Sequence, residues 1–276
     1  MKPYLRHRTK RCLSIALLVA SLFLMSCEET IDLDLDQVKQ HIVIEGVLSD
    51  KPLVSGVRLS FTKSIYAASP TKTVSGAVVT LSDDNGNSEV LQEVQPGNYA
   101  VTRMTGSVGR EYRLNVTFEG TDYSAVSRMP GSMSLDSVWA SASGNDPRFS
   151  RQVELMYFVA NKPGIEEFCI IKAYSQNEGQ QYYWTLYSDK NSNGRQAVLN
   201  GPSFYTSGTS VRVEIIAIDK AVYEYLRALE EIVGHDTFVL PDLLRMNEYN
   251  PRSNITNDAL GYFSAQSQRD YVVNLR

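Results

Sequence analysis

The chain contains few residues that could act as catalytic acids, bases or nucleophiles. Beyond residue 26 its histidines are His41 and His235, which is little material for a metal site or a serine–histidine triad, and no G-x-S-x-G motif occurs. The stretch SFTK at 60–63 matches the S-x-x-K of penicillin-binding enzymes. However, VRLSFTKSI has the pattern of a β-strand, in which residues three apart point to opposite faces. We therefore expect no enzymatic activity.

Calcium is the best metal candidate in the sequence. DKNSNG, at 189–194, matches the first six positions of an EF-hand loop, with oxygen ligands at Asp189, Asn191 and Asn193. The twelfth position is Asn200, where an EF-hand has a bidentate glutamate, so the affinity for calcium would be poor. The alternative, which we favour, is a hairpin turn, because Asn, Asp and Gly tolerate positive φ.

A cluster of aromatic residues, QQYYWTLYS, offers a binding surface. On a β-strand Trp184 would lie on one face, and Tyr183 and Tyr187 would lie on the other. Rings on both faces could leave at least one exposed, and exposed rings bind sugars or anchor partner proteins. We favour the alternative that one face belongs to the core and the other is covered by a second sheet or a helix.

Cys27 is the residue for which the sequence predicts a definite chemistry. The first 26 residues contain five basic residues, no acidic ones and the apolar run LSIALLVASLFLM, which is typical of a secretory signal peptide. The run is shorter than the roughly 18 to 20 residues of a membrane-crossing helix. Leu24, Ser26 and Cys27 match a bacterial lipobox, in which the chain is cut before the cysteine and a diacylglycerol is attached to its thiol. The alternative is an ordinary signal peptide that ends near a cysteine.

Cleavage after residue 26 would change the charge of the protein. Without its five basic residues the chain keeps 22 Lys plus Arg against 31 Asp plus Glu, a net charge of −9. Such a chain is not expected to bind nucleic acid or anionic lipid by charge. Cys12 would leave with the signal peptide and Cys27 would carry lipid, so Cys169 could form no intramolecular disulfide. Its apolar surroundings predict a buried, inert thiol. We expect no cofactor beyond the lipid on Cys27.

The first predicted domain covers residues 41–130, and a short segment, residues 27–40, precedes it. Residues 27–40 are interpreted as the lipidated cysteine and an acidic tether; the IDLDLD piece could pair with a sheet edge, although three aspartates on one side suit solvent. Residues 41–130 contain about seven short runs rich in Val, Leu, Tyr and Thr, separated by Gly, Asn and Asp. The clearest run, YRLNVTF, alternates apolar and polar residues. This pattern predicts an immunoglobulin-like or transthyretin-like β-sandwich.

The second predicted domain covers residues 131–276. Pro130 and Gly131 interrupt the strand pattern, and further strand-like runs follow. One helix is expected at about 220–233, because Asp219 can cap it and apolar residues recur at helical spacing up to Gly234. The fold class is therefore mainly β, with two β-rich domains and one helix in the second; a single elongated double sheet is the alternative.

Several segments in their order resemble a known family. They are a cysteine followed by IDLDL, then IVIEGVLSD, VSGAVVTLSDDNGN with PGNYAV, SLDSV and SNITNDALGYFSA. The chain resembles the Bacteroidota lipoprotein family known as domain of unknown function 4249, over nearly its whole length after Cys27. The family's tail usually has glycines before the LGYF-type element, where this chain has Asn257, Asp258 and Ala259.

The resemblance implies a location and a partner. Members of this family are often encoded beside outer-membrane receptors of the TonB-dependent type, which implies an accessory role at the outer membrane. Glu28 and Glu29 resemble signals that send lipoproteins to the cell surface. We expect a non-enzymatic, lipid-anchored outer-membrane protein that works with such a receptor in nutrient uptake. The alternatives are a protein that captures glycans or nutrients with its aromatic residues, and an adhesin or fimbria-like subunit that exchanges strands between copies.

Overall fold

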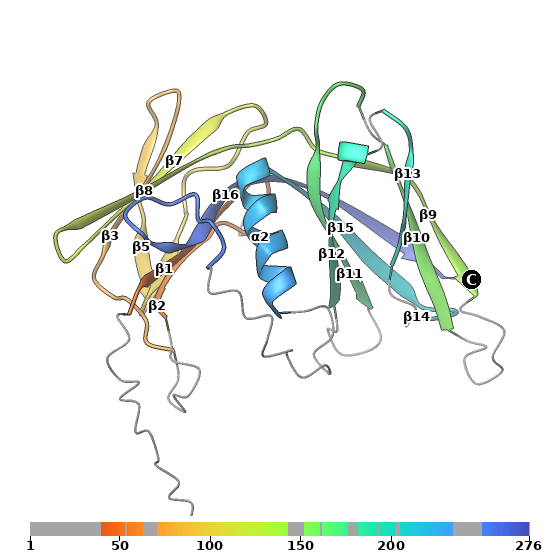
Figure 1. Ribbon diagram of the computed structural model, residues 1–276, viewed down its shortest axis with the longest axis horizontal. Coiled ribbons are helices and arrows are strands. Elements are labelled where there is room, and N and C mark those ends of the chain that lie inside the picture. Colours follow the sequence, from red (N-terminus) through yellow and green to blue (C-terminus); the bar gives the residue numbers. More distant parts are fainter. Residues whose placement is uncertain are drawn as a thin grey trace, which may run out of the picture. The chain divides into compact units, whose positions relative to one another are not determined.

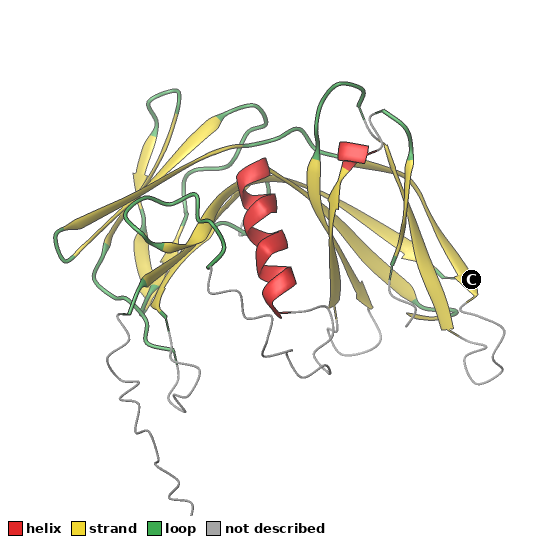
Figure 2. Ribbon diagram, in the orientation of Figure 1, coloured by secondary structure: helices red, strands yellow, loops and turns green. Residues whose placement is uncertain are grey.

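The computed structural model describes residues 40–52, 54–62, 71–142, 152–160, 162–175, 182–191, 194–201, 205–233 and 250–275 (Figure 1). They belong to one compact unit, Gln40–Arg276. Most of the described residues lie in β-strands, and one α-helix occurs among them (Figure 2). The prediction of a mainly β fold with a helix is confirmed.

The largest sheet has eight strands and joins distant parts of the chain. Its order is β12-β11-β15-β16-β1-β2-β6-β5. The strands are β1 (Ile42–Ser49), β2 (Gly56–Phe61), β5 (Gln92–Gln95), β6 (Asn98–Ala100), β11 (Phe168–Ser175), β12 (Tyr182–Ser188), β15 (Ser210–Ile218) and β16 (Leu260–Asn274). Figure 1 shows the blue strand β16, from the end of the chain, beside the orange strand β1 from its beginning.

Strand β16 connects the two halves of this sheet. Its first half pairs with β1 in parallel, from Leu260 to Gln266, and its second half pairs with β15 in antiparallel fashion, from Ser267 to Asn274. The two partners lie on opposite edges of β16. β16 comes from the second predicted domain and β1 from the first, so the two regions are joined by a direct strand pairing.

A first core lies between the β1 half of this sheet and a four-stranded sheet of order β4-β3-β7-β8. These strands are β3 (Val78–Asp83), β4 (Ser88–Val90), β7 (Glu111–Phe118) and β8 (Thr121–Arg128). Ile44 and Leu59 meet Leu81 and Leu114 in this core. β7 alternates buried and exposed residues, as the sequence predicts for a strand with one face on a core.

A second core lies between the β15 half of the large sheet and a third sheet. The third sheet consists of β9 (Ser134–Ala142), β10 (Gln152–Ala160), β13 (Ala197–Asn200) and β14 (Tyr205–Thr206). Tyr157 of β10 packs with Ile171 of β11 and Val213 of β15. Cys169 belongs to this core and is fully buried, as expected from its apolar surroundings.

Helix α2 (Lys220–Val233) covers the other face of the β15 half and lies at the predicted positions. Its start is fixed by Asp219, whose Oδ1 accepts the backbone N–H of Val222 at 2.9 Å. The same carboxylate accepts the hydroxyl of Ser127 at the end of β8, and the Ser127 Oγ accepts the backbone N–H of Ala265 in β16 at 2.9 Å. The helix cap is therefore bonded directly to β8 and, through Ser127, to β16.

Candidate functional site

The predicted lipid attachment lies outside the described residues. Cys27 and the acidic segment up to residue 39 precede Gln40, where the description of the chain begins. Among the described residues, no helix combines the length and the apolar character needed to cross a membrane.

The structure separates the predicted aromatic cluster onto two faces of β12. Tyr187 lies opposite Cys169 of β11, faces the second core and is 6% exposed. Trp184 lies opposite Lys172, on the α2 side of the sheet, and is 42% exposed. The side chain of Tyr183 lies outside the described residues. Trp184 and Tyr187 therefore cannot stack on the same face of one ligand.

The calcium candidate Asp189, at the end of β12, bonds to the residue that precedes β11. It opens a short 3-10 helix, Asp189–Asn191, and its buried carboxylate accepts the backbone N–H of Glu167 at 2.8 Å. The side chain of Asn191 and the whole of Asn193 lie outside the described residues. Within the described part of the chain, no group of three or more His, Cys, Asp or Glu residues could hold a metal ion.

The buried thiol has the wrong electrostatics for a nucleophile. Burial raises the pKa of Cys169, and the nearby Glu167 carboxylate raises it further. A thiolate is therefore disfavoured, whereas nucleophilic cysteines have a lowered pKa.

A cleft of about 560 Å³ lies between α2 and β12. Its floor contains the rings of Phe168 and Tyr223, whose centroids are 4.8 Å apart. Three cations line it, Lys190, Lys220 and Arg227, together with two carboxylates, Glu166 and Glu224, and Lys220 Nζ is 3.3 Å from Glu166. This size is typical of small-molecule sites, and the mixture of rings and cations suits a ligand with an apolar face and an anionic group. Tyr187 also lines the cleft, but Trp184 does not.

The hydrogen bond between Arg227 Nη1 and the Tyr223 hydroxyl, at 3.2 Å, holds the guanidinium at the cleft. It also raises the pKa of Arg227, so this cation keeps its charge. The three cations outnumber the two carboxylates in the lining by one, so the cleft has a small net positive charge beside its aromatic floor.

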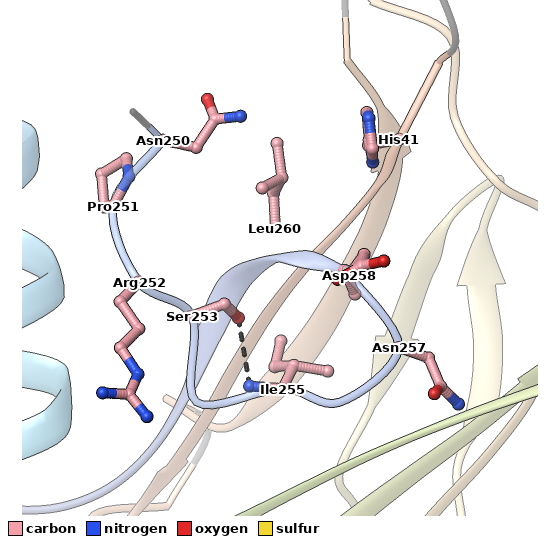
Figure 3. Close-up of a pocket in the computed structure, with 10 residues that line it drawn as sticks. His41, Asn250, Pro251, Arg252, Ser253, Ile255, Asn257, Asp258 and Leu260 are labelled. Atoms are coloured by element: carbon pink, nitrogen blue, oxygen red, sulfur yellow. Dashed lines mark hydrogen bonds between the residues drawn. The ribbon is translucent and has the colours of Figure 1, made fainter. Parts of the chain in front are cut away.

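A second hollow, of about 440 Å³, lies under the segment that leads into β16 (Figure 3). Figure 3 shows Asn250, Leu260 and His41 around it, with the Ser253 hydroxyl accepting the backbone N–H of Ile255. This segment contains the SNITND motif of the family resemblance. The side chains of Ser253, Asn254, Thr256 and Asn257 are bonded to the protein backbone, which gives the motif a structural role.

Asn254 and Ser253 replace a missing strand on one edge of β16. The side-chain amide of Asn254 accepts the N–H of Phe263 at 2.9 Å and donates to its carbonyl at 2.8 Å, as a neighbouring strand would. The Ser253 hydroxyl donates to the carbonyl of Gly261 at 2.8 Å. The segment thereby satisfies backbone groups of β16 on the edge opposite β1, ahead of the stretch that pairs with β15.

Asn257 and Asp258 explain the departure from the glycines that are usual in the family. Their φ angles are 57° and 56°, in the left-handed region. Asn and Asp adopt this region more readily than other residues with a side chain, so they can occupy positions that suit glycine. Asn257 Nδ2 also donates to the carbonyl of Asp122 in β8.

The more exposed of the two tryptophans, Trp139, was missed by the sequence reasoning. Trp139 of β9 is 61% exposed, lies 6.1 Å from the ring of Phe158 and shares its face with the exposed Val198. The alternation in SVWAS contained the signal, because Val138 and Trp139 must point to opposite faces. Length and composition alone could not say which of the two faces the core.

The described residues thus form a mainly β protein with two cores, one covering helix and a cleft beside that helix. The chain belongs to the family described as Domain of unknown function (DUF4249), whose model matches residues 28–271. The match begins at the residue that follows Cys27. No curated protein matches the chain.

Proposed function

We propose that this protein is a non-enzymatic binding protein, held at a bacterial outer membrane by a lipid on Cys27. The observation that carries the proposal is that three boundaries follow one another closely in the sequence. The lipobox-like stretch ends at Cys27, the family match begins at residue 28 and the compact unit begins at Gln40. Residues 28–271 thus match the family's sequence, and the proposal assigns the role of a tether to residues 28–39.

The tether would decide how far the binding module can move from the membrane. Twelve residues span at most about 40 Å when fully extended. The net charge of −9 after residue 26 gives the module no attraction for anionic lipid, so the acyl chains would provide the attachment. The family resemblance supports a position beside a TonB-dependent receptor, and Glu28 and Glu29 support display on the cell surface.

We expect Cys27→Ala to move the protein from the membrane to the soluble fraction, because the substitution removes the thiol that would carry the lipid. The measurement is fractionation of cells that produce the full chain, with mass spectrometry of the protein's N-terminal peptide. The same membranes, crosslinked mildly, should yield a TonB-dependent receptor with the wild-type protein and not with Cys27→Ala.

Cys169→Ala is the matched control, since it removes a buried thiol that has no part in anchoring. It should leave the protein in the membrane fraction. A Cys27→Ala protein that remains in the membrane would contradict the anchor, and an anchored protein that crosslinks to no receptor would contradict the accessory role.

The cleft between α2 and β12 favours ligand capture as a second candidate function. We expect acidic glycans to bind more tightly than neutral ones on a glycan array, because Lys190, Lys220 and Arg227 line the cleft. Lys190→Ala should weaken the binding of acidic glycans severalfold. Arg113→Ala removes an exposed cation from β7 and should have no effect. If Trp184→Ala loses binding and Lys190→Ala keeps it, the glycan binds at the exposed ring of Trp184 and not in the cleft.

A further inference from the structure

The second half of β16 has an unpaired edge. β1 ends at Ser49, opposite Gln266, and Asp50 then covers the next step: its N–H donates to the Gln266 carbonyl at 3.2 Å, and its Oδ1 accepts the N–H of Gln268 at 2.9 Å. Backbone groups of alternate residues point to the same edge of a strand. The N–H and C=O groups of Asp270, Val272 and Asn274 therefore point to this edge, where no described strand pairs with them.

Strand β9 also has an unpaired edge. The N–H of Gly201 donates to the carbonyl of Leu155, so the backbone groups of Leu155 point toward β13 and those of Met156 point toward β9. Met156 lies opposite Trp139, which leaves the backbone groups of Val138 on the far edge of β9. In the described part of the chain, β9 has β10 as its strand partner.

The two free edges face each other across a slot. A hollow of about 470 Å³ is lined by Leu135 to Val138 on β9 and by Tyr271 to Asn274 on β16. The bond that crosses it comes from a side chain: the Tyr271 hydroxyl accepts the backbone N–H of Leu135 at 3.1 Å. Paired strands lie about 4.8 Å apart and bond backbone to backbone, so these two strands are separated by more than one strand spacing. Figure 1 shows β9 and the end of β16 on the same side of the view.

The chemistry of the slot selects an extended peptide. β16 offers the backbone donors and acceptors of Asp270, Val272 and Asn274, and β9 offers those of Val138; another strand can satisfy these groups. The inner side borders the second core through Val138, Tyr271 and Val273, all partly buried, and would accept apolar side chains. The outer side is charged: Arg212 and Lys51 both contact the carboxylate of Asp270. A fitting strand therefore alternates apolar and polar residues.

Residues 31–36 of this chain have that alternation: apolar Ile31, Leu33 and Leu35 are separated by aspartates. The same molecule cannot place them in its own slot. Val43 pairs with Leu260, and Asp270 lies ten residues further along β16. The distance from Val43 to Asp270 along the sheet is therefore about 33 Å, at 3.3 Å per residue. Residues 37–39 span at most about 11 Å.

We propose that the slot between β9 and β16 binds residues 31–36 of a second copy of the protein. The donated strand bonds to both free edges, turns its apolar residues toward Tyr271 and Val273, and leaves its aspartates in solvent on the outer side, where Arg212 is already paired with Glu214 and Asp270. Because the donor segment and the slot are different surfaces, each bound copy still offers its own slot, so the contact is heterologous and open-ended. Neither the lipid anchor nor the receptor is needed for this pairing.

The test uses the lipid-free chain from residue 27, with Cys27→Ala, which keeps the donor segment and the whole compact unit. Its mass is followed by light scattering as the concentration rises, and a synthetic peptide of residues 28–39 is added as competitor. We expect open-ended association that the peptide reverses. In the hydrogen exchange of single amides, measured at a concentration where the chain is monomeric and its slot is empty, the peptide should slow the exchange of Asp270, Val272 and Asn274.

Two pairs of variants make the result specific. Leu33→Asp should weaken association roughly tenfold or more, since it places a charge against the core, whereas Asp34→Asn on the outer side should associate normally. Leu33→Asp lies outside the compact unit and should still bind the peptide. Val272→Pro removes an N–H that points into the slot without removing a bond to β15, and it should not bind the peptide; Val272→Thr should.

The proposal is overturned if the peptide slows exchange at none of the three amides. It is also overturned if Leu33→Asp associates as strongly as its parent, which would indicate contact through another surface such as two β16 edges. The peptide and Leu33→Asp experiments decide the matter even if Val272→Pro fails to fold.

Discussion

Gly261→Ala should lower the free energy of unfolding by more than about 3 kcal/mol, the range of severe backbone and packing defects. Gly261 has a φ of +96°, which residues with a side chain rarely adopt. A Cβ atom built there would meet the carbonyl oxygen of Ile44 at 2.1 Å. The contact is with backbone in the parallel pairing of β1 and β16, so no side-chain rotation can relieve it. Urea denaturation followed by circular dichroism measures the loss.

Gly120→Ala is the matched control for this prediction. Gly120 also has a positive φ, +77°, but a Cβ there would meet no atom within 4 Å. It should therefore cost only the backbone strain of a positive φ, about 1 kcal/mol. Equal losses in the two variants would contradict the close approach between Gly261 and Ile44.

Glu89→Gln should lower the free energy of unfolding by about 2 to 4 kcal/mol at neutral pH, because a buried charged acceptor would lose its charge while its donors stay buried. The Glu89 side chain is 2% exposed. Its carboxylate oxygens accept hydrogen bonds from the backbone N–H groups of Thr102, Arg103 and Met104 and from the Thr102 hydroxyl. Glutamine would place an NH₂ group against these donors. Chemical denaturation of both proteins measures the difference.

The effect of Glu89→Gln should depend on pH in a definite direction. Burial raises the pKa of Glu89, but the hydrogen bonds from the 102–104 loop outweigh burial and leave the pKa below its usual value. A carboxylate with a lowered folded pKa contributes stability above its unfolded pKa, about 4.3, and loses it as the pH falls through the folded pKa. The difference between wild type and Glu89→Gln should therefore be constant near neutral pH and shrink below about pH 4.

Glu111→Gln provides the control, since Glu111 begins β7 with an exposed side chain. Its substitution should change stability by less than about 0.5 kcal/mol. A stability difference for Glu89→Gln that stays constant down to low pH would indicate that shape, and not the charge of the carboxylate, is responsible.

Local patterns in the sequence predicted individual elements well. The helix lies where Asp219 and the apolar spacing placed it, and β7 buries Tyr112, Leu114 and Val116 as its alternation indicates. These predictions succeed because helix caps and the two-residue period of a strand are properties of neighbouring residues.

Partners that lie far apart in the chain could not be predicted in this way. No local pattern says that β1 pairs with a strand more than 200 residues later, or that Ser127 bonds to the cap of α2. The same limit applies to the candidate sites. Alternation placed Trp184 and Tyr187 on opposite faces, but only packing decides that Tyr187 faces the core and that Trp139 faces outward.

By itself the sequence determined the mainly β class, the position of the helix, the family and the cysteine for which lipid attachment is proposed. Each of these depends on composition or on residues close together in the chain. The tertiary structure decided that one long strand joins two cores, that a cleft forms beside α2 and that a slot remains between β9 and β16. These features depend on which edges and faces meet after folding, and pairing energies between distant segments leave no local trace in the sequence.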